Sequence, residues 1–318
     1  AAPGDGQVLL KMKCLGICGT DLHAYKGRQP FFTYPRILGH EMAAEIAAVG
    51  DQVTHLKPGD LCTVMPYRNT KIDQAVRNGH LNCGSGLAYM GVHEDGAMQE
   101  YMLFDADRVM VTNGLTAAQT AMIEPLTFGS HAVERADIAP NDTVLLVGAG
   151  PIGMMILSMG ALKAARFIVT DTNEERLQFV RNKFKGVECL PANDQLSTSL
   201  AALLNGDAPV KVIDATGNRE SMMKCFDYVA PGGTIVYVGL FIGNVEFYDP
   251  QFHAKEITLK ASRAGLPEDF QKIIRLLRAG SINIDDLITH HLPFDSLADT
   301  FPGLYATEKL LIKAVVDY

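Results

Sequence analysis

The stretch TVLLVGAGPIG at Thr143–Gly153 decides the fold. Its first five residues are apolar or β-branched and predict a buried strand, and a turn of the form G-x-G-x-x-G then leads into an apolar helix. Asp171 lies 21 residues after Gly150, at the end of the next predicted strand. A strand, this turn, a helix and a later acidic residue together are the fingerprint of a dinucleotide-binding βαβ unit.

The glycine-rich turn also predicts how a dinucleotide binds. Its glycines allow a tight turn and a close approach of the pyrophosphate to the helix N-terminus, whose dipole favours anions. Asp171 can accept hydrogen bonds from the adenosine ribose and would repel a 2′-phosphate, so we expect NAD rather than NADP, although Arg176 could partly offset this repulsion. The alternative interpretation is a plain turn and an aspartate that caps the next helix. The residues expected to contact the cofactor are Gly148, Gly150, Pro151, Ile152, Gly153, Asp171, Arg176, Thr216, Gly217, Val238, Gly239, Leu240, Ser262 and Arg263.

Strands and helices alternate after this unit, which indicates an α/β fold with a doubly wound parallel sheet. Residues 8–115 differ, because glycines and short β-like runs predict a mostly β domain there. A helix is predicted over 117–136, interrupted at Pro125. We expect a catalytic domain in 1–125, a dinucleotide-binding domain in 126–262 and a return to the first domain in 263–318. Other strands are expected at 8–17, 166–170, 210–214, 234–238 and 256–261, and other helices at 154–164, 174–182 and 220–229.

A second group of chemically active residues lies in the mostly β part. The segments CGTDLH at 18–23 and GHE at 39–41 bring a thiol, two imidazoles and carboxylates within 24 positions. Zinc binds such donor atoms, and a catalytic zinc needs only three protein ligands. A small buried cysteine and a core histidine are the alternative, but a dinucleotide site in the same chain favours zinc and points to alcohol oxidation. The expected ligands are Cys18 and His40, with Glu41 or Glu124 as the third, directly or through water.

The residues around these ligands suit the oxidation of a secondary alcohol. Zinc lowers the pKa of a bound hydroxyl, which must lose its proton before hydride transfer. Thr20 offers a hydroxyl beside the reacting oxygen, and His23 can carry the proton to solvent. Asp21 is placed to orient His40 through its other ring nitrogen. Local helix capping is the alternative for Thr20 and His23, and a carboxylate that ends a helix turn is the alternative for Glu124.

Composition limits the class of partner. The 318 residues are 47% hydrophobic and 20% charged, with a net charge of -8. An acidic chain is a poor partner for nucleic acid or an anionic membrane, and no apolar run reaches the ~18 residues of a membrane span. The first six residues lack the features of a signal peptide, and six irregularly spaced cysteines do not suggest a disulfide framework. We therefore expect a cytoplasmic protein that acts on a small molecule.

With these residues in view, the chain resembles the zinc-dependent medium-chain dehydrogenases, in the branch of sorbitol, threonine and sugar-acid dehydrogenases. The likeness spans nearly the whole chain. It lies in GICGTD at 16–21, ILGHE at 37–41, DG at 95–96, EPL at 124–126, the glycine-rich turn and VIDATG at 212–217. A narrower likeness, to bacterial L-galactonate and L-gulonate 5-dehydrogenases, lies in PFFTYPR at 30–36, SR at 262–263 and PEDF at 267–270.

The resemblance implies a GroES-like catalytic domain and a Rossmann domain, in a homodimer or homotetramer joined through the Rossmann sheets. It also implies oxidation of a secondary hydroxyl of a hexonate such as L-galactonate or L-gulonate, with NAD. Tyr34 and Arg263 are the expected substrate contacts, since a guanidinium matches a carboxylate in two hydrogen bonds. Arg36 is the alternative carboxylate partner, and Arg263 could instead form a surface ion pair or a cofactor contact. A sorbitol-like polyol or L-threonine is the alternative substrate, and an NAD-binding structural or sensor protein is the non-enzyme alternative.

Two departures from the family pattern affect these expectations. Relatives often hold a second, structural zinc on four cysteines, whereas the aligned positions here are Thr70, Asp73, Val76 and Gly84. We therefore expect one zinc per chain and a looser lobe, because metal binding contributes folding free energy. The family's first strand has no counterpart before Ala1. Either the sequence is part of a longer chain, or the first sheet has an uncovered edge.

Overall fold

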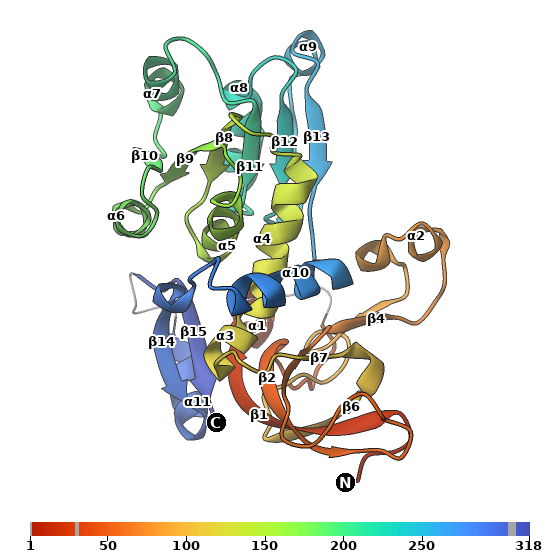
Figure 1. Cartoon of the computed structure of the whole chain (residues 1–318). Coiled ribbons are helices and arrows are strands. Elements are labelled where there is room, and N and C mark those ends of the chain that lie inside the picture. The colour runs from red at the N-terminus through yellow and green to blue at the C-terminus, as the bar shows by residue number, and fades with distance from the viewer. Residues whose placement is uncertain (1, 29–31, 305–309) are drawn as a thin grey trace. The chain divides into compact units, whose positions relative to one another are not determined.

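The chain divides into two units, Ala1–Pro125 with Gly265–Tyr318, and Leu126–Ala264. The computed structural model describes residues 2–28, 32–304 and 310–318 (Figure 1). Pro30 and Phe31, which belong to one segment of the family likeness, lie outside the described residues. The units divide at 125/126 and 264/265, beside the expected boundaries at 125/126 and 262/263.

The first unit is built on a β-sheet whose strands are β1 Gln7–Gly16, β2 Glu41–Val49, β3 Leu61–Val64, β6 Tyr101–Asp105, β7 Val109–Val111, β14 Ile288–Pro293 and β15 Lys313–Asp317. In the described part of the chain their order is β14-β15-β1-β2-β3-β7, with β6 also paired to β1. β1 pairs antiparallel with β2 and with β15. The predicted strand at 8–17 and the mostly β character of this unit are observed, and Gly265–Tyr318 also belongs to this unit.

Short elements surround this sheet. They are the helices α1 Gly19–Tyr25, α2 Gln74–Arg77, α3 Ala117–Ala121, α10 Pro267–Arg278 and α11 Leu297–Thr300, and the hairpin strands β4 Tyr67–Asn69 and β5 Leu87–Tyr89. α10 begins at a proline, whose missing N–H would have no helical partner at that position. Its residues Phe270, Ile273, Ile274 and Leu277 are buried at the spacing of one helix face. The sheet core contains the fully buried Leu10, Met12, Leu15, Ile17, Met42 and Ile46.

The helical stretch at 117–136 breaks earlier than predicted. α3 ends at Ala121, Met122 is its C-cap, and α4 spans Ile123–Ala136. Pro125 therefore lies in the first turn of α4 and does not interrupt a helix. A proline is tolerated there, because the first N–H groups of a helix have no intrahelical acceptor. This early start places Glu124 in the first turn of α4.

The second unit contains a six-stranded parallel sheet of β8 Thr143–Val147, β9 Arg166–Asp171, β10 Glu188–Pro191, β11 Lys211–Asp214, β12 Thr234–Tyr237 and β13 Thr258–Ala261. Among the described residues the order is β10-β9-β8-β11-β12-β13. Numbered along the chain this is 3-2-1-4-5-6, the order of a Rossmann fold. The predicted α/β fold class is confirmed. The helices are α5 Pro151–Gly160, α6 Glu174–Lys183, α7 Leu196–Leu203, α8 Arg219–Tyr228 and α9 Asp249–Ala254.

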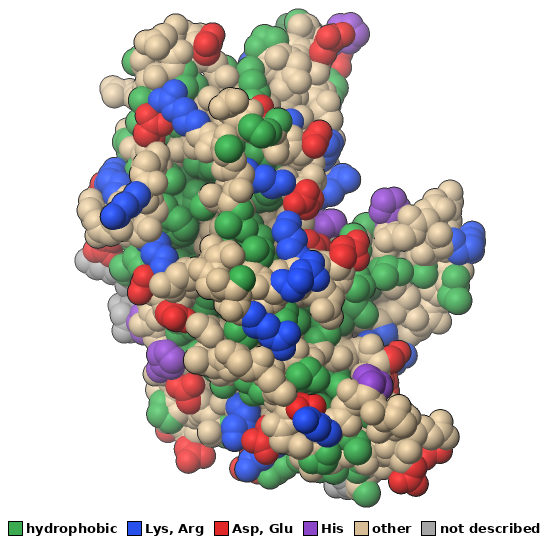
Figure 2. Space-filling model, in the orientation of Figure 1, with side chains coloured by type: hydrophobic (Ala, Val, Ile, Leu, Met, Phe, Trp, Pro, Cys, Tyr) green, Lys and Arg blue, Asp and Glu red, His purple; other side chains and the backbone are tan. Residues whose placement is uncertain are grey.

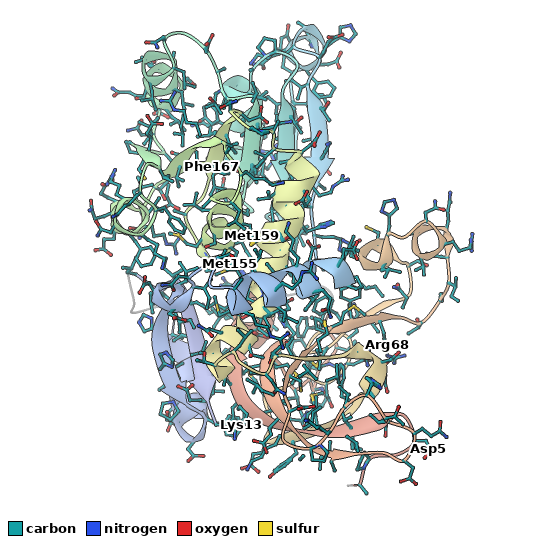
Figure 3. All side chains as sticks on the ribbon, viewed as in Figure 1. Asp5, Lys13, Arg68, Met155, Met159 and Phe167 are labelled. Atoms are coloured by element: carbon teal, nitrogen blue, oxygen red, sulfur yellow. The ribbon has the colours of Figure 1, made fainter. Side chains whose placement is uncertain are left out.

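α5 is enclosed by the core of this unit. Eight of its ten residues are buried, as expected of a helix that is apolar all round. Figure 3 labels Met155 and Met159 on α5 and Phe167 on β9. A Cβ at Gly160 would lie 2.3 Å from the Phe167 ring, so glycine is needed where the helix ends. The predicted end at 164 is four residues too late.

The molecular surface carries mixed charge. On the face that Figure 2 shows, acidic and basic side chains are interspersed among polar and hydrophobic ones. None of the helices in the described segments combines the length and the apolar character of a membrane span.

Candidate metal centre and cofactor site

The first part of the site lies where β1 ends and α1 begins. Cys18 is the N-cap residue of α1. The buried carboxylate of Asp21 accepts hydrogen bonds from the backbone N–H of Cys18 at 2.9 Å and of Gly39 at 3.1 Å. One carboxylate thus joins the two segments that carry Cys18 and His40.

Asp21 does not bond the His40 ring as the sequence predicted. Its Oδ1 lies 3.8 Å from His40 Nδ1, which is too long for a hydrogen bond. Asp21 acts on the backbone of both ligand segments instead. His40 Nδ1 is buried and has no hydrogen-bond partner. Because such a nitrogen costs free energy until something satisfies it, this atom indicates a site built for a group beyond the chain itself.

Two glycines pack closely against the backbone of Gly39, the residue before His40. A Cβ at Gly91 or Gly96 would come within 2.7 or 2.3 Å of the Gly39 carbonyl oxygen. The N–H of Ala97 donates to that same oxygen at 2.9 Å. Gly96, the glycine of the DG segment, is therefore required, because any side chain there would collide with the Gly39 carbonyl oxygen. The close packing of these backbones restrains the turn that carries His40.

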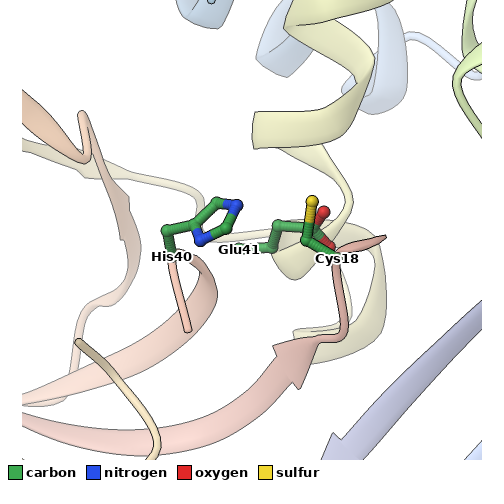
Figure 4. Close-up of side chains that lie close together, drawn as sticks. All are labelled: Cys18, His40 and Glu41. Atoms are coloured by element: carbon green, nitrogen blue, oxygen red, sulfur yellow. The ribbon is translucent and has the colours of Figure 1, made fainter. Parts of the chain in front are cut away.

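Three of the four side chains expected as zinc ligands converge. The ligand atoms of Cys18, His40 and Glu41 all lie within 4.8 Å of one another, and Figure 4 shows the three side chains turned toward one space. His40 and Glu41 are buried, and Cys18 is half-buried. A thiol, an imidazole and a carboxylate at this spacing fit zinc, whose bonds to such atoms are about 2.0–2.3 Å long. Cys14 is buried in β1, and burial raises the pKa of its thiol to about 12, as expected for a structural residue.

Glu41 has a second partner in this unit. The ammonium of Lys313 on β15 forms an ion pair with its carboxylate, and both side chains are almost fully buried. A Cβ at Gly16 would lie 2.1 Å from Glu41 Oε2, so glycine at the end of β1 makes room for the carboxylate. Sequence reasoning missed Lys313, since nothing local marks a lysine 272 positions away as the partner of Glu41.

Glu124 lies beside this cluster and is held separately. The Tyr89 hydroxyl donates to Glu124 Oε1 at 2.6 Å. Burial raises the pKa of Glu124 to about 7, against the lowering influence of His40. Burial by itself lowers the pKa of His40, but Asp21, Cys18 and Glu124 raise it well above its usual value. Buried acidic groups around one imidazole favour a cation. This charge adds to the donor types and their spacing as a reason that zinc fits the site. Tyr89 had no signal in the sequence.

The other predicted residues of this unit lie on or near α1. Thr20 is half-buried and His23 is exposed, both within α1. Tyr34 is exposed, and its hydroxyl donates to the Ala24 carbonyl oxygen at 2.6 Å. Arg36, the alternative substrate contact, donates to Asp95 at 3.0 Å. Their proposed roles stay predictions.

In the second unit, the glycine-rich turn joins β8 to α5. Gly150 is the N-cap of α5 and Pro151 is in its first turn, followed by Ile152. A Cβ at Gly153 would lie 1.9 Å from the Gly148 carbonyl oxygen, and Gly148 has a φ of 100°. Both glycines are therefore required. The free N–H groups of a helix start face the space that a pyrophosphate would occupy in such folds.

Asp171 at the end of β9 braces this turn. Its Oδ2 accepts from the N–H of Ala149 at 2.7 Å, and its Oδ1 accepts from the N–H of Asn173 at 2.7 Å. Arg176 on α6 lies over the turn, with Nη1 3.6 Å from where a Cβ of Gly150 would stand. A carboxylate and a guanidinium thus flank the predicted ribose position.

The ends of β11 and β12 complete the candidate cofactor site. Asp214 is buried and accepts from the N–H and the hydroxyl of Thr216. A Cβ at Gly239 would lie 2.1 Å from the Gly217 nitrogen, so these two loops touch. A pocket of about 340 Å³ is lined by residues at the ends of β8, β9 and β11, including Gly148, Asp171 and Thr216. The remaining predicted contacts are Val238 and Leu240, after β12, and Ser262 and Arg263, after β13.

The lobe at 70–86 contains the four positions where relatives often carry cysteine. Asp73 is the N-cap of α2, accepting from the N–H of Val76, and it also accepts from the N–H of Ser85 at 2.6 Å. Thr70 donates its hydroxyl to Gly86. Hydrogen bonds, rather than sulfur ligands, therefore organise these positions.

The family is established by comparison with known proteins. Residues 4–113 match the alcohol dehydrogenase GroES-like domain, and residues 151–279 match the zinc-binding dehydrogenase family. The chain is 40% identical to L-galactonate-5-dehydrogenase of Escherichia coli K12, over 99% of this chain and 93% of that protein. It is 31% identical to sorbitol dehydrogenase of Ovis aries, over 94% and 86%.

A solved structure agrees with this assignment. The alcohol dehydrogenase RspB of E. coli CFT073, complexed with NADH, is 28% identical to the chain and matches it with a TM-score of 0.92 over 100% of this chain and 94% of that one. Together with the donor cluster and the Rossmann turn, these matches confirm the predicted family. The chain belongs to the zinc-dependent medium-chain alcohol dehydrogenases and is an alcohol-type oxidoreductase that uses a nicotinamide cofactor.

Proposed function

We propose that the protein oxidises a secondary hydroxyl of a six-carbon sugar acid, such as L-galactonate or L-gulonate, to a ketone with NAD. The observation that carries the substrate class is the 40% identity to an L-galactonate-5-dehydrogenase over nearly the whole chain. The convergence of Cys18, His40 and Glu41 supports the reaction type. A sorbitol-like polyol is the second candidate substrate, favoured by the 31% identity to a sorbitol dehydrogenase.

Separate residues of the chain would bind the metal, transfer the proton and bind the cofactor. Zinc, held by Cys18, His40 and either Glu41 or Glu124, would supply a Lewis acid for the substrate hydroxyl, and NAD would accept the hydride. Thr20 accepts or donates a hydrogen bond at that hydroxyl, and exposed His23 passes the released proton to solvent. The turn Gly148–Gly153 holds the pyrophosphate, and Asp171 holds the ribose.

A substrate screen tests the proposal. NAD reduction by metal-loaded protein is followed with L-galactonate, L-gulonate, sorbitol and L-threonine at equal concentrations. We expect the highest kcat/KM with a hexonate. A higher kcat/KM with sorbitol or L-threonine would replace the sugar acid, and no turnover with any of them would contradict the substrate class altogether.

We also propose one zinc per chain, supported by the single donor cluster found among the described residues and by the composition of the lobe at 70–86. Metal analysis of purified protein should give one equivalent per chain. Two tightly bound equivalents would contradict it.

We propose a cytoplasmic location because the six cysteines are free, which suits a reducing compartment.

A homodimer or homotetramer is proposed through the edge strand β13. Thr258, Leu259 and Ala261 on this strand are exposed, as are Leu240 and Tyr248 in the segments before it. An uncovered strand edge with apolar side chains favours pairing with another chain. Light scattering should give twice or four times the chain mass, and Leu259→Lys should reduce it. A monomeric wild type would contradict the proposal.

A further inference from the structure

The hairpin β4–β5 brings an aromatic pair to the metal centre. Tyr67 and Tyr89 are cross-strand partners, and their rings stack with centroids 5.7 Å apart. The Tyr67 hydroxyl is buried and donates to the Gly265 carbonyl oxygen at 2.8 Å. The Tyr89 backbone N–H is also engaged, because His93 Nδ1 accepts it at 3.1 Å. Tyr89 is therefore fixed both by its backbone and by a ring that is itself anchored.

The other side of Tyr89 meets two of the expected metal ligands. Its hydroxyl donates to Glu124 Oε1 at 2.6 Å. The edge of the His40 ring and the Tyr89 ring meet almost at a right angle, with centroids 5.6 Å apart. One side chain thus contacts both the carboxylate, which comes from α4, and the imidazole, which comes from the residue before β2.

We infer that Tyr89 is a positioning residue of the metal centre, which holds the Glu124 carboxylate and the His40 ring in the orientation that binds the ion. This rests on the zinc-dependent reaction proposed above. A glutamate has three rotatable side-chain torsions, and a hydrogen bond to its charged oxygen is among the strong ones. Partners that hydrogen-bond a ligating group tune metal affinity, and losing one costs typically 10- to 100-fold in affinity or activity. No motif quoted above contains Tyr89, and its role is inferred from the contacts of its side chain.

The first test measures metal binding without substrate or cofactor. Tyr89→Phe removes only the hydroxyl and keeps the ring that packs on Tyr67 and His40. Tyr237→Phe is the matched control, because Tyr237 is also half-buried and donates its hydroxyl to the Met222 carbonyl oxygen at 2.6 Å, in the unit that contains none of the expected zinc ligands. Cobalt(II) replaces zinc, so that its visible absorption reports the arrangement of the ligands, and a competing chelator gives its affinity. Thermal unfolding of the metal-free proteins shows whether each variant is folded.

We expect Tyr89→Phe to bind cobalt roughly 10- to 100-fold more weakly than wild type, with altered absorption bands. Tyr237→Phe should match wild type in both. Wild-type affinity and spectrum in Tyr89→Phe would overturn the inference. Wild-type protein that takes up no cobalt would contradict the proposed metal chemistry as well, whereas turnover of a polyol in place of a hexonate would leave the inference intact.

The second test asks whether Tyr89 acts through Glu124. A double-mutant cycle measures cobalt affinity and kcat/KM for Tyr89→Phe, Glu124→Ala and both together, because alanine removes the oxygen that accepts the Tyr89 hydroxyl. If the hydroxyl works by holding the carboxylate, adding Tyr89→Phe to Glu124→Ala should change either quantity by no more than about twofold. If Tyr89→Phe kept its full 10- to 100-fold effect in protein that already carries Glu124→Ala, Tyr89 would act without the carboxylate. That result would overturn the positioning role.

Discussion

Asp171 is predicted to bind the cofactor, and in the structure it also stabilises the glycine-rich turn. The predicted task is to bind the ribose and repel a 2′-phosphate. The structure adds bonds from its two oxygens to the N–H groups of Ala149 and Asn173. A test of cofactor selection therefore needs a substitution that removes the charge of Asp171 but keeps a hydrogen-bond acceptor for the glycine-rich turn.

We expect Asp171→Asn to narrow the preference for NAD over NADP by roughly tenfold, since it removes the repulsive charge and keeps one acceptor oxygen. Asp171→Ala should narrow it too, and should also lower stability by about 1–3 kcal/mol for each N–H that it leaves buried and unsatisfied. Kinetics with both cofactors and thermal unfolding measure the two effects. An unchanged cofactor ratio in the Asn variant would remove Asp171 from cofactor selection.

Arg263 is exposed directly after β13 and is the proposed partner of the substrate carboxylate. Losing one charge-assisted bond costs about 1.5–3 kcal/mol, or roughly 10- to 150-fold in kcat/KM. Arg263→Leu should impose this loss on a hexonate and much less on the matching polyol. Arg166→Leu is the control, because Arg166 starts β9 and is paired with Glu188. Equal losses for both substrates would assign Arg263 to the cofactor or to folding.

At the level of elements, the lobe at 70–86 depends on Asp73. The N–H groups of Ser85 and Val76 lower the pKa of Asp73 to about 2, from a usual value near 3.8. A lowered native pKa means that the unfolded lobe binds the proton more readily. The contribution of Asp73 is therefore complete above about pH 4 and is lost as the pH falls through about 2.

Asp73→Ala should accordingly make the amide protons of α2 and its neighbours exchange faster at pH 7, because α2 loses its N-cap and Ser85 loses its acceptor. Hydrogen exchange followed by mass spectrometry checks this. Asp107→Ala, a control on an exposed carboxylate outside the lobe, should have no such effect there. Exchange that is unchanged in residues 70–86 of Asp73→Ala would show that other contacts hold the lobe.

The elements that could be predicted are those with strong local signals. β8 was predicted to the residue, because five apolar or β-branched residues run into a glycine-rich turn. β10 and α7 were missed, since β10 has only four half-exposed or exposed residues and α7 buries only two of its eight. The helix start at Ile123 was misplaced, because a proline breaks a helix interior but fits a first turn.

The whole molecule shows what local patterns cannot predict. Cys18, His40 and Glu41 were predicted because the residue types themselves indicate metal chemistry. The partners of the carboxylates were not predicted. Lys313 reaches Glu41 only in the folded sheet, and Tyr89 reaches Glu124 only through the folded hairpin. Candidate metal ligands can thus be proposed from their residue type, whereas the residues that contact them depend on long-range packing.

The two units have separate cores, and each contains a candidate site of its own. The predicted metal ligands belong to the first unit, and the glycine-rich turn and Asp171 belong to the second. Removing the metal should therefore abolish turnover while changing the Kd for NADH little. Cofactor at 100 times its Kd stabilises whatever it binds by about 2.7 kcal/mol, so NADH should still raise the Tm of chelator-treated protein and of Cys18→Ala. Asp171→Ala, assayed in parallel, should lose part of this rise and keep its metal. If chelation removed the rise in Tm as well, the metal centre would be required for cofactor binding, and the two candidate sites would not be independent.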